Sequence, residues 1–191
     1  MMDSTDPIAT LGHDRASARE QGDGNANLCV VSSVDATGEP QARVLVLRDI
    51  DSRLGIFLNG SSPKASEFGH GERISVLAWL PSLGVQYRIS CRLEAMDPQI
   101  VRESWQLRPL AAKRLDWLYQ RSPQGSAVED RATLLARLAQ MESDTAPANA
   151  LGYFLVPERV DRLALDNDTG VHDRRLFERE GDAWGCKLLI P

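Results

Sequence analysis

Cationic and hydroxyl side chains gather at the start of a short predicted helix and on a strand that precedes it. The segment Ser61-Ser62-Pro63-Lys64 has the serine, proline and lysine of a helix N-terminus, where unpaired backbone N–H groups and the helix dipole favour a bound phosphate. Arg43 supplies a guanidinium that can bind phosphate through paired, charge-assisted hydrogen bonds. These residues form a candidate phosphate site, although an ordinary capped surface helix would have the same sequence.

The strand that contains Arg43 carries an arginine on each face. Side chains alternate along a strand, which places Arg43 on one face with two leucines and Arg48 on the other face with Val44 and Val46. Arg48 lies near the strand end, where its guanidinium either extends into solvent or faces a ligand.

Polar side chains also occur on two later strands. Gln86 lies in a strand of mainly apolar and basic residues; an inward-facing amide there would both donate to and accept from the edge of a heterocycle, whereas a solvent-facing glutamine would need no ligand. His172 and Arg174 alternate onto one face of a predicted strand over residues 172–180, so we expect them to act together. The alternative is an edge strand protected by its charges.

Strand and helix signals along the chain predict an α+β, barrel-like architecture with helices inserted after the fifth of nine strands. There is no alternation of strands and helices and no glycine-rich phosphate loop, so a Rossmann or P-loop domain is not expected. The expected strands cover residues 27–35, 41–50, 54–59, 73–80, 85–96, 151–156, 159–166, 172–180 and 184–190; the expected helices cover 7–21, a short segment from 63, two segments within 98–120 separated at Pro109, and 128–142.

The length and composition of the chain favour a single domain over residues 1–191, and we expect residues 1–5 to be disordered. A net charge of −5 argues against non-specific nucleic-acid binding. No apolar run reaches the ~20 residues of a membrane helix, and no signal peptide is recognisable, so we expect a cytoplasmic protein without membrane contact. Cys29, Cys91 and Cys186 are expected to be buried thiols, and the three histidines lack the spacing of a metal site.

In the order of its segments, the chain resembles the pyridoxamine 5'-phosphate oxidase family, the flavin-binding split barrels. The similarity extends over essentially the whole chain, and its most specific parts are GYFLVPERV at residues 152–160 and the C-terminal motifs HDR and GDAW. The resemblance implies a mainly antiparallel split β-barrel with peripheral helices. It also implies a homodimer with FMN at the subunit interface.

The resemblance assigns site residues position by position. Arg43, Ser62 and Lys64 would hold the FMN phosphate, the backbone of residues 44–46 would line the isoalloxazine, and Gln86 would reach its polar edge. No catalytic residue is assigned. The full cofactor-binding set is Arg43, Val44, Leu45, Val46, Arg48, Phe57, Leu58, Ser62, Lys64, Gln86 and Arg174; the substrate-binding set is Arg48, Arg108 and His172.

The chain departs from the family pattern mainly where the vitamer substrate would bind. Gly170 replaces an arginine, and Ser104 and Ala112 replace a tyrosine and a serine that flank Arg108 in sequence. The family lysine that helps hold the vitamer phosphate is matched by Arg48. Near the flavin, Pro63 replaces an arginine of the phosphate loop and Ala164 replaces a tryptophan. Each lost charge-assisted hydrogen bond is worth about 1.5–3 kcal/mol, so a vitamer phosphate would bind weakly.

These observations predict an FMN-binding oxidoreductase that acts on a small molecule other than the usual vitamer, at a CH–NH or CH–CH bond. Relatives resembling this family also oxidise phenazine precursors. Two alternatives stay open. One is a non-catalytic split barrel that holds a flavin or another cofactor. The other is a true pyridoxamine 5'-phosphate oxidase with a rebuilt substrate pocket.

Overall fold

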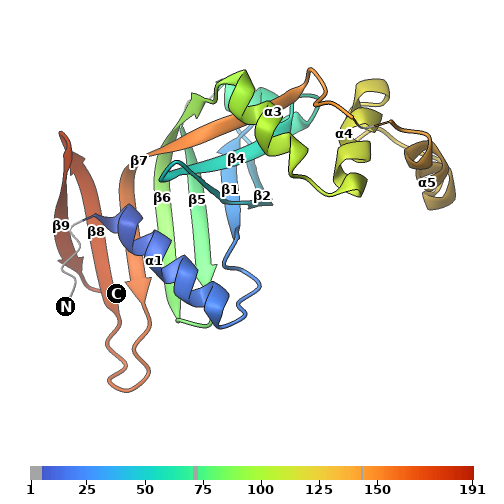
Figure 1. Cartoon of the computed structure of the whole chain (residues 1–191). Coiled ribbons are helices and arrows are strands. Elements are labelled where there is room, and N and C mark those ends of the chain that lie inside the picture. Colours follow the sequence, from blue (N-terminus) through green and yellow to red (C-terminus); the bar gives the residue numbers. More distant parts are fainter. Residues whose placement is uncertain (1–5, 71–72, 143) are drawn as a thin grey trace.

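The computed structural model (Figure 1) describes residues 6–70, 73–142 and 144–191. The disorder expected at residues 1–5 lies outside these ranges. The helices are α1 (Pro7–Glu20), α2 (Pro63–His70), α3 (Pro98–Gln106), α4 (Leu110–Arg121) and α5 (Arg131–Ala139). The strands are β1 (Leu28–Val34), β2 (Pro40–Val46), β3 (Arg48–Ile50), β4 (Arg53–Asn59), β5 (Arg73–Leu80), β6 (Val85–Ala95), β7 (Ala150–Ala164), β8 (Asp173–Glu180) and β9 (Ala183–Leu189).

The nine strands of the described residues form one antiparallel, strongly curled sheet (Figure 1). Its order is β2-β1-β5-β6-β7-β4-β3, and β8 and β9 extend it from the second half of β7. The expected α+β architecture is therefore confirmed, with the helices between β6 and β7 as predicted. Strand β2 lies at the end of the main order, so one of its edges is not paired with another strand of the described sheet.

One predicted strand is divided in two at Leu47. The chain bends there because the buried Leu47 leaves the ladder: its N–H donates to the Asn27 carbonyl at 2.9 Å and its own carbonyl accepts from Arg15 at 2.8 Å. The segment before the bend pairs with β1, and the segment after it pairs with β4. The bend thus brings two sides of the curled sheet together.

Two other predicted strands, at residues 151–156 and 159–166, are one continuous strand, β7. Its register against β6 shifts where Cys91 pairs with Pro157 and Ser90 pairs with Arg159, so Glu158 is the extra residue of a bulge. Proline has no N–H to donate to the ladder, which explains why the pairing is irregular at Pro157. The strand does not end there but continues through the bulge.

The core lies inside the curled sheet. Fully buried side chains from five strands fill it, among them Val31, Ile56, Val76, Tyr87 and Val160. Helix α1 lies across one face (Figure 1) and contributes Leu11. The expectation of three buried thiols is wrong for one: Cys29 and Cys91 are buried, but Cys186 on the terminal strand β9 is exposed.

Helices α3, α4 and α5 extend from one end of the sheet (Figure 1). The predicted break at Pro109 is confirmed, because α3 ends at Gln106 and Pro109 is the N-cap of α4. Helix α5 is shorter than predicted and begins after Asp130, whose side chain accepts from the Thr133 N–H at 2.7 Å. Among the described residues, no helix is long and apolar enough to cross a membrane.

Candidate active site

One candidate site is a cleft of about 630 Å³ between the sheet and the link from α3 to α4. We call it the main cleft. Its sheet side contains five residues predicted to bind flavin: Val44, Leu45, Val46, Arg48 and Phe57. Its helical side contains Arg108, so the two arginines predicted to contact substrate, Arg48 and Arg108, border one space.

The walls of the main cleft are mostly apolar. Val44 and Val46 are 62% and 43% exposed on the unpaired strand β2, and Leu107, which is 87% exposed, lies on the opposite side. Ser104 and Ala112 occupy the two positions that flank Arg108. The cleft therefore suits a flat, largely apolar molecule with an anionic group for the arginines.

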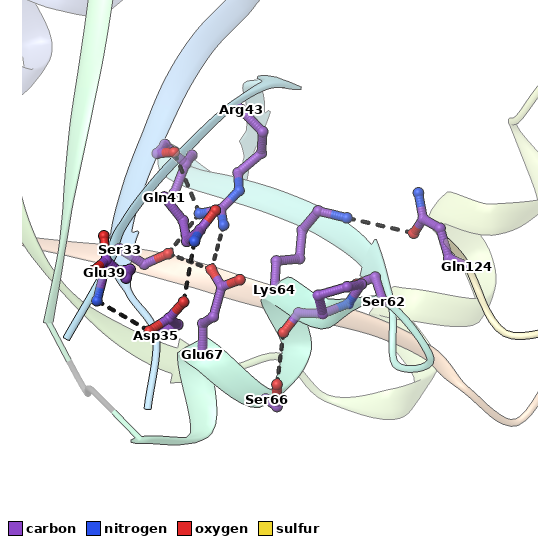
Figure 2. A network of polar contacts seen from close by, with 12 residues as sticks. Ser33, Asp35, Glu39, Gln41, Arg43, Ser62, Lys64, Ser66, Glu67 and Gln124 are labelled. Atoms are coloured by element: carbon purple, nitrogen blue, oxygen red, sulfur yellow. Dashed lines mark hydrogen bonds and ion pairs between the residues drawn. The ribbon is translucent and has the colours of Figure 1, made fainter. Parts of the chain in front are cut away.

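A second polar group, which we call the phosphate corner, lies where β2 meets α2 (Figure 2). The Arg43 guanidinium forms an ion pair with Glu67 and donates to Ser33 Oγ at 2.5 Å. Ser33 Oγ in turn donates to Glu67 Oε2 at 2.6 Å. Glu67 is buried, so Arg43 is held in place by a carboxylate from the core side of α2.

Lys64 belongs to the same corner and lies one helical turn before Glu67 (Figure 2). Its Nζ lies 3.5 Å from Gln124 Oε1, which comes from the loop after α4. Burial, reinforced by the charge of Arg43, lowers the pKa of Lys64, and Glu67 opposes that shift. Ser62 is buried and its hydroxyl donates to the Asn59 carbonyl at 2.7 Å. Arg43 and Lys64 therefore lie near each other beside the start of α2, whereas the Ser62 hydroxyl is bound to the backbone of the chain itself.

Gln86 lies in a separate space, a groove of about 570 Å³ that we call the second groove. Gln86 pairs with Trp79 and Leu163 on the neighbouring strands, and all three line the groove. Val44 borders both this groove and the main cleft. The exposed strand β2 is thus the element shared by the two spaces.

The C-terminal residues do not line the main cleft in this single chain. Arg174 makes two hydrogen bonds to Asp161, at 3.1 and 2.8 Å, and these bonds lower the pKa of the buried Asp161 carboxyl. Strand β8 begins at Asp173, one residue later than predicted, so His172 precedes the strand that contains Arg174. His172 belongs to the preceding loop, where its Nδ1 accepts from the Asp166 N–H at 3.2 Å.

Leu58, also predicted to bind flavin, is buried in the hydrophobic core. Its neighbour Phe57 lines the main cleft instead. A strand alternates its side chains between two faces, and on β4 the side chain of Leu58 packs in the core while Phe57 borders the main cleft.

Behind Arg108 lies a carboxylate that the sequence analysis missed. Asp116 on α4 is buried, and its Oδ2 accepts from the Trp105 indole N–H at 2.8 Å. The Arg108 Nε lies 3.3 Å from the same oxygen. Burial raises the pKa of Asp116, while Arg108 and the indole N–H oppose the shift. We call these three residues the Asp116 cluster.

Glu67 and Asp161 were missed in the same way as Asp116. All three are buried carboxylates that pair with an arginine predicted to bind a ligand. Asp116 has a sequence signal, because it is an acidic residue between apolar neighbours in Leu115-Asp116-Trp117, but that signal does not identify its partner. Glu67 and Asp161 each have a polar or charged neighbour and lack this signal.

Comparisons with known proteins agree with this architecture. The family model described as pyridoxamine 5'-phosphate oxidase matches residues 20–143. The chain is 31% identical over 185 residues to the pyridoxine/pyridoxamine 5'-phosphate oxidase of Ectopseudomonas mendocina (strain ymp), covering 93% of this chain and 84% of the relative. It is 30% identical over 172 residues to that of Pseudomonas paraeruginosa (strain DSM 24068 / PA7), covering 86% and 78%.

Two solved structures share the fold over nearly their full lengths. PhzG from Burkholderia lata 383, solved in complex with tetrahydrophenazine-1-carboxylic acid, has a TM-score of 0.88 at 22% identity and covers 100% of this chain and 95% of its own. A pyridoxamine 5'-phosphate oxidase-related, FMN-binding protein from Nostoc punctiforme PCC 73102 has a TM-score of 0.79 at 20% identity and covers 96% of both chains. With its split-barrel fold, this chain belongs to the pyridoxamine 5'-phosphate oxidase family.

Proposed function

We propose that this protein is a homodimeric, FMN-dependent oxidoreductase that acts on a small molecule other than a pyridoxine or pyridoxamine phosphate. The observation that carries the proposal is the main cleft. There, residues at flavin-binding positions on β2, β3 and β4 face Arg108 across a space of about 630 Å³, while the positions flanking Arg108 are Ser104 and Ala112.

The residues of the phosphate corner fit the phosphate of FMN. Arg43 and Lys64 supply two cations beside the start of α2, where the helix dipole favours an anion. Next to them, the unpaired edge of β2 offers backbone donors and acceptors to the polar edge of a flavin ring. Bound FMN would supply the chemistry by accepting a hydride from the substrate.

The chain's own residues would bind and orient the substrate. Arg48 and Arg108 would hold an anionic group on the two sides of the cleft. The exposed apolar side chains of Val44, Val46 and Leu107 would pack on its ring and exclude water. A CH–NH or CH–CH bond held against the flavin would then be the site of oxidation.

A second copy of the chain would complete the site. The flavin positions of one chain fall in separate places: the main cleft, the second groove around Gln86 and the Arg174–Asp161 pair. Val44 and Val46 expose apolar surface at the unpaired edge, which a partner would bury. Across a two-fold interface, Arg174 and His172 of one copy would approach the flavin that the other copy holds.

The departures around Arg108 favour a substrate other than the vitamer phosphates. Tyrosine and serine hydroxyls would each donate to a phosphate oxygen, but Ala112 has no donor and Ser104 is shorter than tyrosine. In the complex of the similarly folded PhzG, the ligand is tetrahydrophenazine-1-carboxylic acid. A ring-bearing carboxylic acid of this kind is therefore the first candidate substrate to test.

The experiment has two stages. The purified protein is first titrated with FMN, followed by quenching of flavin fluorescence, and one FMN per chain is expected. The loaded protein is then mixed without oxygen with a panel of substrates, and bleaching of the visible flavin absorption, which follows reduction of the flavin, is recorded. Reduction by a non-vitamer compound and reoxidation by air are expected.

Other outcomes assign the alternatives. Flavin that binds but is reduced by none of the compounds would favour a cofactor-binding protein without turnover. Pro63 and Ala164, which replace family residues at two flavin-side positions, would agree with that outcome. Efficient reduction by pyridoxamine 5'-phosphate would establish a vitamer oxidase with a rebuilt pocket and would refute the proposal. Failure to bind FMN would refute the assignment of the cofactor.

A further inference from the structure

We propose that Asp116 sets the charge preference of the main cleft, so that the site takes a singly charged, ring-bearing carboxylate in preference to a phosphate dianion. The inference deepens the proposed function and rests on its assignment of the main cleft as the substrate site. It assigns to Asp116 the part of a positioning and specificity-determining residue that acts through Arg108.

The first step concerns the geometry of the Asp116 cluster. Trp105 donates to Asp116 Oδ2 at 2.8 Å, which fixes the carboxylate between α3 and α4. Arg108 lies in the short link between these helices, with its Nε 3.3 Å from the same oxygen. Asp116 is buried, but Arg108 retains about a third of its side-chain exposure and borders the cleft. The carboxylate therefore lies behind the arginine as seen from the cleft.

The second step concerns the charge that the cleft presents to a ligand. Its charged lining residues are Arg48, Asp49 and Arg108. Asp49 forms an ion pair with the buried Arg15 at 2.5 Å. Arg15 does not line the cleft, so the negative charge of Asp49 is neutralised by a residue outside it. Asp116 offsets Arg108 in the same way. Arg48 alone among these lining residues has no ion pair within the described part of the chain, which leaves one uncompensated positive charge.

The third step compares two ligands of different charge. The attraction of an anion to Arg108 and its repulsion by Asp116 are both about twice as large for a phosphate dianion as for a monoanion, since the Coulomb energy is proportional to the product of the charges. The Asp116 carboxylate therefore removes most of the advantage that a dianion would have at Arg108. The phosphate would also need more donors than the cleft provides at Ser104 and Ala112. A carboxylate needs one guanidinium fork, and the apolar walls suit its ring.

Two probes that share a ring and differ in charge test this inference: 1-naphthoate, a monoanion, and 1-naphthyl phosphate, a dianion at pH 8 because the second phosphate pKa is about 6. Their dissociation constants are measured by calorimetry on the FMN-treated protein. We expect the wild type to bind 1-naphthoate more tightly. Asp116→Asn keeps the shape and an acceptor for Trp105, and we expect it to shift the ratio of the two dissociation constants about tenfold toward the phosphate.

Three further variants make the result specific. Glu103→Gln removes the same charge from an exposed position on α3 and is expected to leave the ratio unchanged. Asp116→Ala removes the carboxylate by a second route and should shift the ratio in the same direction as Asp116→Asn. Arg108→Gln should weaken both probes.

The inference is overturned if both Asp116 variants, folded by circular dichroism, keep the wild-type ratio within about twofold, or if neither probe binds the wild type. A ratio of dissociation constants that shifts toward the phosphate in both Asp116 variants supports it. This readout needs no turnover and is therefore separate from the proposed function, which fails if the flavin is not reduced by any substrate.

Discussion

The phosphate corner and the Asp116 cluster use the same pair of charged groups with different surroundings. Each contains a partly exposed arginine that is paired with a buried carboxylate: Arg43 with Glu67, and Arg108 with Asp116. Beside the first pair lies a second cation, Lys64. Beside the second pair lies the neutral Trp105, whose indole N–H binds the carboxylate.

This difference changes the charge that each site offers. The phosphate corner keeps one positive charge after Arg43 and Glu67 are counted together, and it adds the start of α2. The Asp116 cluster keeps none, and the cleft depends on Arg48 for its positive charge. A buried carboxylate paired with an arginine thus holds the guanidinium in place at both sites, but the remaining neighbours decide whether a dianion or a monoanion can bind.

The largest expected effect follows from removing both cations of the phosphate corner. Arg43→Ala with Lys64→Ala should weaken FMN binding by at least about 100-fold, because two charge-assisted interactions with the phosphate are lost. Fluorescence titration with FMN measures the loss. Arg92→Ala with Lys187→Ala removes the same two residue types from exposed positions on β6 and β9 and should keep the wild-type affinity.

Arg43→Ala alone would leave the buried Glu67 without its cation, which destabilises the fold as well as the site. Arg43→Ala combined with Glu67→Gln avoids this and should still bind FMN weakly. If either double variant at the corner retains wild-type affinity, the phosphate does not bind there.

A third pair, Arg174 with Asp161, serves as a reference because its effect on stability can be measured without a ligand. Asp161 accepts two hydrogen bonds from Arg174 and lies 3.5 Å from Arg88. Asp161→Asn should lower the free energy of unfolding by about 2 kcal/mol at pH 7, as expected for hydrogen bonds to charged groups. Urea denaturation measures it.

The pH dependence of this variant has a definite sign. The pKa of Asp161 is lowered in the folded protein, with the Arg174 hydrogen bond as the main cause. Its stabilisation is therefore fully present above the unfolded pKa of about 3.9 and is lost as the pH falls through the lower folded value. The stability gap between wild type and Asp161→Asn should shrink below about pH 4; a constant gap would show that the charge is not its cause.

The sequence predicts the fold better than the site, for a physical reason. Strand alternation, turns and the proline at residue 109 act locally, so the strands, the helix insertion and the α3–α4 break are readable from the chain. The bend at Leu47 depends on hydrogen bonds from Arg15 and to Asn27, which are distant in sequence or outside the strand. No local pattern contains such contacts.

The same limit applies to the candidate site. The sequence identifies four candidate anion-binding residues, because their side chains are cationic and they match positions of the family pattern: Arg43, Arg48, Lys64 and Arg108. The carboxylate partners of Arg43 and Arg108 come from other elements: Glu67 lies 24 positions after Arg43, for example. Partners brought together by the fold become visible only in the structure, although they decide how much of each arginine's charge a ligand meets.

The smallest effect separates the two pairs most directly. Glu67→Gln keeps an acceptor for Arg43 and Ser33 but removes the negative charge of the phosphate corner, so FMN should bind about fivefold more tightly. Asp116→Asn removes the same charge from the Asp116 cluster and should leave FMN affinity within about twofold of the wild type, because Asp116 lies against Arg108 and not in the phosphate corner. Both constants come from the same fluorescence titration. If Asp116→Asn tightened FMN binding as much as Glu67→Gln does, the charges of the two sites would act on one ligand, and the division between a cofactor phosphate site and a substrate site would be wrong.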